Sequence, residues 1–321
     1  MKEAEEHKSK TSVDEEWQMR EYYRICTLGG MLSAGTTHLL ITPLDVLKVN
    51  MQVNPVKYNR MGSSLSILWK EQGSYAFCRG WSSKFFGYGI QGGLKYGLYE
   101  YFKRFYSDML VEHNKSVIFF LSSASAQLVA DVALCPFEAV KVCVQTQPTF
   151  AKGLVDGFPK LYASRGISGL YKGLFPLWGR NLPFSMIMFS TFEHSVDMLY
   201  GNVIQRRKED CSRAQQLGVT SLAGFVAGAV GTVISNPADN IVSSLYNKKA
   251  DSVLQAIKNI GLLNLFTRSL PVRLTIVGPV VTLQWFLYDS IKVLCGLPTS
   301  GGLNRHTEET THIMKKHQRV A

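Results

Sequence analysis

The sequence lacks paired cysteines. Its six cysteines are scattered along 321 residues, and no two of them form a C-x-x-C pair. Disulfide frameworks and structural zinc sites both depend on recurring cysteine spacings. Neither is therefore expected, and the thiols are interpreted as small apolar side chains in reduced form.

Basic runs with interleaved aromatic residues are also missing. The formal net charge of +11 would suit a nucleic-acid partner, but such proteins gather their basic residues into a patch. Here Lys and Arg lie mainly in connecting segments and at the ends of apolar segments. This distribution indicates contact with anionic lipid headgroups or an anionic solute, and no nucleic acid.

The first residues show no targeting signal. Residues 1–21 mix acids and bases without an apolar core, so they are neither a secretory signal nor an Arg-rich transit peptide. They are predicted to form a polar N-terminal tail. Residues 298–321 are polar as well, and we expect a disordered C-terminal tail there.

Long uncharged segments contrast with the mean hydropathy of +0.01, which alone would suit a soluble protein. Residues 214–238 carry no charge, and residues 25–44 carry only His38. A bilayer span needs about 20 helical residues. Four weaker candidates begin at residues 81, 115, 176 and 273, and they are rich in Gly and Ser. Such composition is typical of helices that line a water-filled cavity. The chain is predicted to be an all-α membrane protein with six transmembrane helices.

A proline–acid–base motif is repeated three times, and we call it the gate motif. Its first copy places Asp45 two residues and Lys48 five residues after Pro43, and in the third copy Val242 replaces the base. The three copies occupy residues 43–48, 136–141 and 237–242. Each closes a long, nearly uncharged segment, and proline inside a helix kinks it. The chain is therefore divided into two-helix repeats at 22–110, 115–204 and 214–297, which predict a pseudo-threefold bundle around a central path.

Two further echoes support this division. A glycine-containing segment follows each gate motif, at residues 71–80, 165–173 and 260–269. An aromatic–acid–base motif ends each repeat, at residues 99–103, 192–196 and 288–292, with Val196 in place of the second base.

Together these motifs resemble those of the mitochondrial carrier family over about residues 22–297. The resemblance implies six transmembrane helices, three short matrix-side helices and alternating access to a central site in the mitochondrial inner membrane. It also implies that both termini face the intermembrane side, that import needs no cleaved presequence, and that the protein is not an enzyme and uses no metal or organic cofactor.

Within the family the chain looks most like the phosphate carriers. The segments responsible are residues 35–48, 130–139, 145–148, 176–183, 236–239, 270–273 and 284–285. The resemblance implies transport of inorganic phosphate with a proton, or equivalently against hydroxide. It further implies a membrane lipid partner, with cardiolipin as the expected lipid, while a single bundle that encloses a path suffices as a monomer.

Two departures from the phosphate-carrier pattern keep alternatives open. Met188 stands where the family usually has a second lysine, and Gln127 stands where it usually has an acid. The chain could instead carry another small anion, such as sulfate, arsenate or a dicarboxylate. A carrier-fold regulator without turnover and a soluble basic protein are the other readings.

The gate charges are predicted to form inter-helix ion pairs that close each end of the path in turn. The matrix-side gate is predicted to consist of Asp45, Lys48, Glu138, Lys141 and Asp239. The intermembrane-side gate is predicted to consist of Glu100, Lys103, Glu193, Asp289 and Lys292. Each set has three acids against two bases, so each gate should be incomplete and should break at modest cost. The alternative is ordinary surface pairs three residues apart.

The predicted substrate residues are Lys95, Gln284, Arg273 and Arg180. When the last helices of the repeats are aligned on their aromatic residues, Lys95, Met188 and Gln284 should face one another across the cavity. A lysine supplies a cation, Gln284 both donates and accepts hydrogen bonds, and an arginine fork can hold two phosphate oxygens. Lys95 could instead extend to an interface, and Arg180 could equally hold matrix-side loops together.

The predicted proton-coupling residues are His38 and Asp131, which occupy equivalent places before the first two gate motifs. A histidine of near-neutral pKa and a carboxylate within a membrane are plausible proton carriers. The alternative for His38 is a hydrogen-bonded packing residue. Since Gln127 cannot titrate, coupling should rest on His38 and Asp131, be weakened, or follow the charge of phosphate itself.

Overall fold

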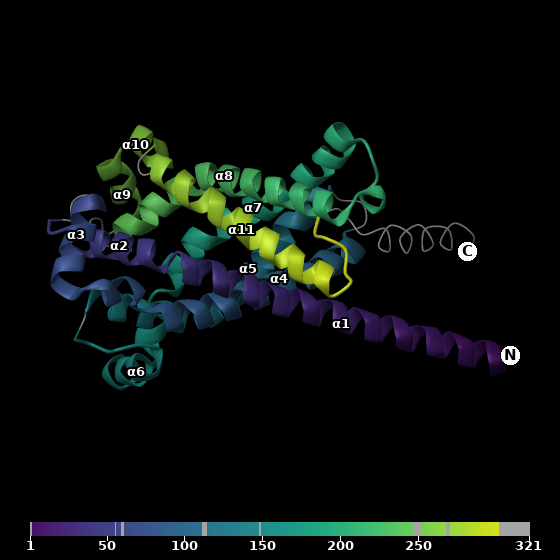
Figure 1. The fold of residues 1–321 in the computed structure, drawn as a ribbon, viewed down its shortest axis with the longest axis horizontal. Coiled ribbons are helices and arrows are strands. Elements are labelled where there is room, and N and C mark those ends of the chain that lie inside the picture. The colour runs from purple at the N-terminus through teal and green to yellow at the C-terminus, as the bar shows by residue number, and fades with distance from the viewer. Residues whose placement is uncertain are drawn as a thin grey trace.

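The computed structural model describes residues 2–54, 56–58, 61–110, 114–147, 149–246, 252–267 and 270–301, and these are helical without any strand (Figure 1). The expected C-terminal tail beyond residue 301 lies outside the described residues. Among the helix side chains that are not described are those of residues 1–18 and of Lys48.

Six long helices carry the fold. The first helix of each repeat is α1 (Lys2–Leu40, continued by α2, Thr42–Val53), α5 (Lys115–Thr146) or α8 (Arg213–Tyr246). The second is α4 (Trp81–Met109), α7 (Leu174–Met198) or α11 (Leu270–Leu294). The helical backbone of α1 begins at Lys2, so the predicted polar tail of residues 1–21 continues into the first span.

The long helices close into a ring. In order around it, α1 packs on α4, α4 on α5, α5 on α7, α7 on α8, α8 on α11, and α11 returns to α1. Close approach requires small residues: a Cβ added at Gly92 on α4 would lie 2.3 Å from the Cβ of Ala34 and 2.6 Å from the carbonyl oxygen of Gly30, both on α1. The ring of six is the arrangement that the triplicated sequence predicts.

Short helices gather at one end of the ring. They are α3 (Met61–Gln72), η1 (Ser74–Cys78), α6 (Leu154–Tyr171), α9 (Val253–Ile260) and α10 (Leu262–Thr267). The start of α1 projects from the opposite end (Figure 1). Following the expected orientation, we refer to the end with α3, α6 and α9 as the matrix end and to the other as the intermembrane end. At the latter, the α7–α8 connection holds η2 (Leu199–Ile204) and η3 (Lys208–Asp210).

The three prolines of the gate motifs differ in their effect. At Pro43 the chain bends by 60° between α1 and α2. By contrast, α5 and α8 run on through Pro136 and Pro237 as continuous helices. The first copy alone therefore separates two helices.

Four spans are long and apolar enough to cross a bilayer by length and composition, if the bent α1–α2 pair is counted as one; the others are α5, α8 and α11. The more polar α4 and α7 complete the ring. On α4 the polarity is turned inward, because Lys84, Glu100 and Lys103 are all buried. This agrees with α4 being a cavity-lining helix, whereas α5 and α11, which the sequence ranked among the weaker spans, qualify as full spans.

Candidate substrate site and gates

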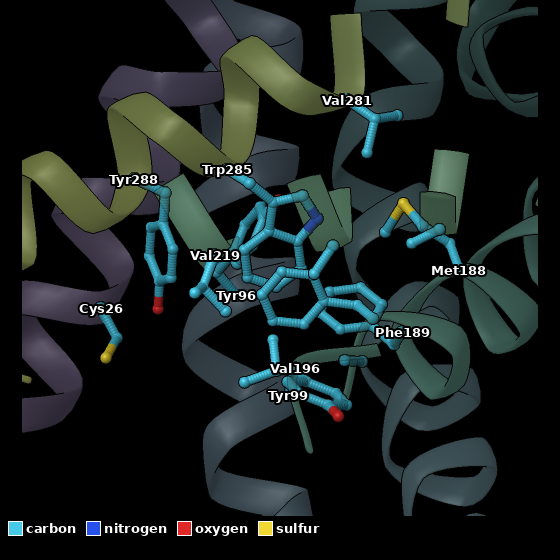
Figure 2. Close-up of a cluster of buried hydrophobic side chains, with 14 residues drawn as sticks. Cys26, Tyr96, Tyr99, Met188, Phe189, Val196, Val219, Val281, Trp285 and Tyr288 are labelled. Atoms are coloured by element: carbon cyan, nitrogen blue, oxygen red, sulfur yellow. The ribbon is translucent and has the colours of Figure 1, made fainter. Parts of the chain in front are cut away.

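An apolar cluster fills the intermembrane half of the ring. Figure 2 shows Tyr96, Trp285 and Phe189, from α4, α11 and α7, meeting at its centre. Trp285 stacks on Phe192 with ring centroids 3.6 Å apart. Met188 is 3 % exposed and belongs to this cluster, so it packs in the apolar layer rather than lining a polar cavity with Lys95.

Lys95 lies at the edge of this cluster. Its ammonium group is 5.2 Å from the centre of the Phe189 ring, a cation–π distance. Its side chain is half-buried, and the carboxylate that acts on its charge is Asp131. Gln284 is also half-buried, next to Trp285 on α11. The structure thus places a cation at the edge of the apolar layer, within the electrostatic influence of a buried acid.

Asp131 is fully buried within a cage of amides. Its Oδ1 accepts hydrogen bonds from the side-chain amides of Gln127 at 2.6 Å, Gln91 at 2.8 Å and Asn181 at 2.9 Å. These donors come from α5, α4 and α7, so one carboxylate joins three helices. Its second oxygen, Oδ2, is buried and makes no hydrogen bond within the part of the chain that the structure describes. Since buried polar atoms rarely stay unpaired, Oδ2 is the natural place for a proton or a solute.

His38 belongs to a different neighbourhood. Its ring stacks on that of Tyr88, with centroids 3.7 Å apart and planes 16° apart. The hydroxyl of Tyr88 donates a short hydrogen bond to Glu138. The charges that act on His38 are, in order of strength, those of Lys84, Asp45, Lys141 and Lys95. The two residues predicted to couple protons are therefore separate: Asp131 lies in the central cage and His38 at the matrix-end charges.

The matrix-end charges form a network across repeats one and two. Lys141 pairs with Glu138 at 2.8 Å within its own helix and with Asp45 of the first repeat at 3.3 Å. Lys84, only 1 % exposed, also pairs with Asp45 at 3.3 Å. Lys48, predicted as the other base of this gate, has a side chain outside the described residues.

The third gate motif finds its cation elsewhere. Arg273 pairs with Asp239 at 2.8 Å and donates to Asn236 at 2.9 Å. Val242, at the place of the missing base, packs near Gly179. Arg273 is thus held at the matrix end rather than beside Lys95.

Arg180 lies between the two networks. Its Nε donates to the Asn181 side chain at 3.1 Å, and Glu138, Asp239 and Asp131 are the carboxylates that act on its charge. It therefore links the amide cage to the matrix-end acids.

Sequence reasoning missed Lys84 as a gate cation, although a signal was present. Lys84 precedes Tyr99 by the same distance that Arg273 precedes Tyr288, so the two cations hold equivalent places in repeats one and three. Each pairs with the acid of its own repeat. The second repeat has Leu177 at that place. The amide donors Gln91 and Asn181 were missed too: Asn181 lies within the segment 176–183 that carries the resemblance but was given no role, and no motif marks Gln91.

The intermembrane-end charges join repeats one and two directly. Lys103 pairs with Glu193 on α7 at 3.0 Å and with Glu100 on its own helix at 3.2 Å. The Tyr99 hydroxyl donates to Glu193 at 3.1 Å. Glu193 and Lys103 are both buried, which makes this pair a seal rather than a surface contact.

Asp289 and Lys292 bind a different element. Asp289 accepts a hydrogen bond from the backbone of Ser300 at 2.8 Å, and Lys292 donates to the hydroxyl of Ser300 at 3.3 Å. Lys292 also lies over the rings of Tyr22 and Tyr288, at 5.5 Å from each centre. The residues predicted for this gate are thus gathered at the intermembrane end, where the segment after α11 joins them.

A comparison with protein families agrees with this architecture. The family model described as mitochondrial carrier protein matches residues 21–110 and 112–203, which is more than half of the chain. The chain belongs to the mitochondrial carrier family. It is accordingly a carrier and not an enzyme, and its six-helix ring is the fold that the resemblance implied.

Curated relatives of this carrier extend over nearly the whole chain. It is 68 % identical over 296 residues to "Mitochondrial phosphate carrier protein 1, mitochondrial" of Arabidopsis thaliana, covering 92 % of this chain and 96 % of the relative. It is 42 % identical over 281 residues to "Solute carrier family 25 member 3" of Bos taurus, covering 86 % and 77 %. It is 40 % identical over 282 residues to "Phosphate carrier protein, mitochondrial" of Caenorhabditis elegans, covering 87 % and 83 %.

The arrangement allows binding and gating without covalent chemistry. A carrier needs a site that attracts the solute and two barriers that open in turn. Here a cation and a caged carboxylate lie between two sets of buried ion pairs. No group of three or more potential metal ligands occurs among the described residues.

Proposed function

We propose that this carrier moves inorganic phosphate across the mitochondrial inner membrane into the matrix, together with a proton or in exchange for hydroxide. The observation that carries the proposal is the half-satisfied carboxyl of Asp131 between the two gates, whose charge acts on that of Lys95. The printed names of the relatives support phosphate as the solute.

Phosphate requires both a cation and hydrogen-bond partners, and Lys95, Gln284 and the amide cage offer these. A carboxylate beside the site would repel a phosphate anion. When protonated, however, Asp131 gains a donor that can point from Oδ2 toward the solute. We therefore propose that phosphate and a proton enter the site together because each improves the binding of the other.

In this proposal the proton is released at the matrix end. His38, stacked on Tyr88 and close to the matrix-end charges, would accept the proton as that gate opens. Arg180 and Arg273 would meet phosphate after it leaves Lys95, because both lie between the cage and the matrix end. The solute's binding energy offsets the rupture of the Asp45–Lys141 pair.

Proteoliposome uptake of labelled phosphate, with and without a pH gradient, tests the proposal. Lys95→Met should abolish uptake, whereas Lys160→Met, which removes an exposed lysine on α6, should leave it unchanged. Asp131→Asn should retain binding but lose the response to the pH gradient. Uptake that ignores the gradient in the wild type would contradict proton coupling.

The same assay separates the other functions. Position 188 holds a methionine in the apolar layer, so it adds no second positive charge to that of Lys95. A site with this charge favours a small anion of low charge. Sulfate, arsenate and dicarboxylates should therefore compete weakly. A dicarboxylate that outcompetes phosphate would replace our choice of solute, and folded protein without any exchange would favour a regulator.

We further propose that the carrier works as a monomer with cardiolipin or a similar anionic lipid bound at its basic connections. One ring of six helices already encloses the site, so no second copy is needed. Native mass spectrometry from mild detergent should show one chain with retained anionic lipid. A stable dimer that loses activity on dilution would refute this.

A further inference from the structure

The intermembrane gate has a gap between repeats two and three. The base of repeat one, Lys103, pairs with the acid of repeat two, Glu193. By the same pattern the base of repeat two should pair with Asp289 of repeat three. That base is replaced by Val196, which is 1 % exposed and cannot pair. We call the intermembrane opening of the ring the mouth. One of the three ion pairs expected between repeats around the mouth is therefore missing from the transmembrane helices.

The segment after α11 occupies this gap. Residues 297–301 leave the helix and turn back over the mouth, and we call them the mouth strap. Its Thr299 and Ser300 are only 2 % and 4 % exposed. The backbone N–H of Ser300 donates to Asp289 at 2.8 Å, and the Ser300 hydroxyl accepts from Lys292 at 3.3 Å. A backbone donor thus meets one oxygen, Oδ1, of the acid that lacks its base, while Oδ2 makes no hydrogen bond within the described part of the chain.

Gly301 seats the strap on Val196. A Cβ added to Gly301 would lie 2.8 Å from the Cβ of Val196, closer than real side chains approach. Its backbone φ of 89° also lies in the left-handed region that favours glycine. Because Gly301 has no side chain, the strap can pack directly against the side chain of Val196.

Lys208 fastens the strap from the α7–α8 connection. Its ammonium group donates to the carbonyl oxygens of Thr299 at 2.5 Å, Gly301 at 3.1 Å and Ser300 at 3.3 Å. An ammonium has three N–H donors, so one side chain meets three carbonyls. Burial, followed by the charge of Lys292, lowers the pKa of Lys208 to about 8, and the ammonium therefore predominates at pH 7.

Gln216, at the start of α8, positions the segment that carries Lys208 against the strap. Its amide nitrogen donates to the carbonyl oxygens of Lys208 at 2.9 Å and Cys211 at 3.1 Å. Its amide oxygen accepts from the Thr299 hydroxyl at 3.3 Å. The strap is therefore bound to α11, to α7 and to the connection before α8, which is to say to repeats two and three at once.

We propose that the mouth strap is the missing third link of the intermembrane gate and must leave its seat each time the mouth opens to the intermembrane space. Lys208 and Asp289 hold it closed from opposite sides. The inference rests on the proposed transport function, since a gate has meaning only in a protein that turns over.

A reversible cross-link tests whether the strap must move. In Val196→Cys/Gly301→Cys the two thiols would lie within the reach of a disulfide after a shift of about 1 Å. Oxidation should join them, stop phosphate uptake in proteoliposomes, and be reversed by a thiol reductant. The double variant before oxidation gives the reference rate, and the single variant Val196→Cys, treated with the same oxidant, should keep its uptake.

The proposal would be overturned if the cross-link forms and uptake continues at the rate of the same variant before oxidation, because the mouth would then open without release of the strap. Wild type without any uptake would instead remove the proposed function, while the yield of the cross-link would still report on the strap.

A second test needs no transport. Cys26 is fully buried beneath the mouth and lies near Tyr288 (Figure 2). Its reaction with a membrane-impermeant maleimide, followed by peptide mass spectrometry, reports mouth opening. Lys208→Gln should speed this reaction about tenfold, equivalent to one hydrogen bond to a charged group. Arg206→Gln removes an exposed charge from the same connection and should change nothing; equal rates in both variants would contradict the fastening role.

Discussion

The buried pair of Lys84 and Asp45 predicts an unequal response to removing its two members. Lys84 is 1 % exposed, and its one ion pair among the described residues is with Asp45 at 3.3 Å. Asp45 is 21 % exposed and also pairs with Lys141 at 3.3 Å. The acid therefore keeps a partner and some solvent when Lys84 is lost, whereas the lysine keeps neither when Asp45 is lost.

The magnitudes follow from this asymmetry. At 3.3 Å the attraction is about 5 kcal/mol for an effective dielectric constant of about 20, and desolvation of a buried ammonium cancels several kcal/mol of it. Lys84→Met removes both terms and should change the free energy of unfolding by less than about 1 kcal/mol. Asp45→Asn leaves a buried charge without compensation and should cost about 3–5 kcal/mol.

Thermal unfolding in detergent, followed by a thiol-reactive dye, measures the difference. Asp45→Asn should lower the midpoint by roughly 5–10 °C, and Lys84→Met by a few degrees at most. The double variant should recover most of the loss, because the uncompensated charge is gone. Asp156→Asn, which breaks the exposed pair with Lys160 on α6, is the control and should leave the midpoint unchanged, because solvent screens that pair.

The reasoning would be refuted if Lys84→Met lowered the midpoint as much as Asp45→Asn does. It would also fail if the double variant were less stable than Asp45→Asn alone, since Lys84 would then contribute through packing and not through its charge.

Three further predictions concern the site and the intermembrane gate. Lys95→Met should weaken phosphate binding about 10- to 100-fold, the loss of one charge-assisted contact, measured as displacement of labelled phosphate; an unchanged affinity would remove Lys95 from the site. Gln127→Glu places a second carboxyl at the 2.6 Å contact with Asp131, so the two should share a proton and make uptake steeper in pH; an identical pH profile would refute the contact. Tyr99→Phe removes the 3.1 Å hydrogen bond to Glu193 and should lower stability by about 1 kcal/mol in thermal unfolding, with no effect on the pH profile of uptake.

The helices could be predicted closely from sequence because their signals are local. The weaker spans were expected to begin at residues 81, 115, 176 and 273, and the helices begin at Trp81, Lys115, Leu174 and Leu270. Each of these signals can be read within a single helix: the length of the uncharged stretch, its glycine content and the gate proline. The ring followed from triplication, since three equal two-helix units close on themselves.

Contacts between helices were harder to predict, because one sequence does not give the register of one helix against another. The amides around Asp131 come from three helices, and nothing in the chain marks Gln91 as a member. The pairing of Asp239 with Arg273 needed the start of α11 to lie beside the end of α8. The mouth strap could not be predicted for another reason. Its backbone groups, rather than its side chains, bind Asp289 and Lys208, and a short polar segment after a helix has the composition of a solvated tail.

The two bases that are missing from the gates, at Val242 and Val196, both affect the interface between repeats two and three. At the matrix end, the base of repeat two pairs with the acid of repeat one, as Lys141 does with Asp45, so Val242 of repeat three should have paired with Glu138 of repeat two. At the intermembrane end, Val196 of repeat two should have paired with Asp289 of repeat three. Among the described residues, repeats two and three therefore lack the ion pair of this pattern at either end, and other contacts must hold them together.

Apolar packing supplies those contacts along the helices. On α8, a Cβ at Gly231 would lie 3.2 Å from Phe184 and 3.5 Å from Met188 on α7, and Val242 packs near Gly179. Contacts of this kind change little when nearby charges re-pair, whereas the pairs between repeats one and two must break and reform at every turnover. Movement of the helices should therefore concentrate at the interface that carries ion pairs, while α7 and α8 stay packed and move together and only the mouth strap is released between repeats two and three. On this argument Met188 is an apolar residue because it belongs to the packed interface, and a lysine placed there would loosen the two repeats before it improved the binding of an anion.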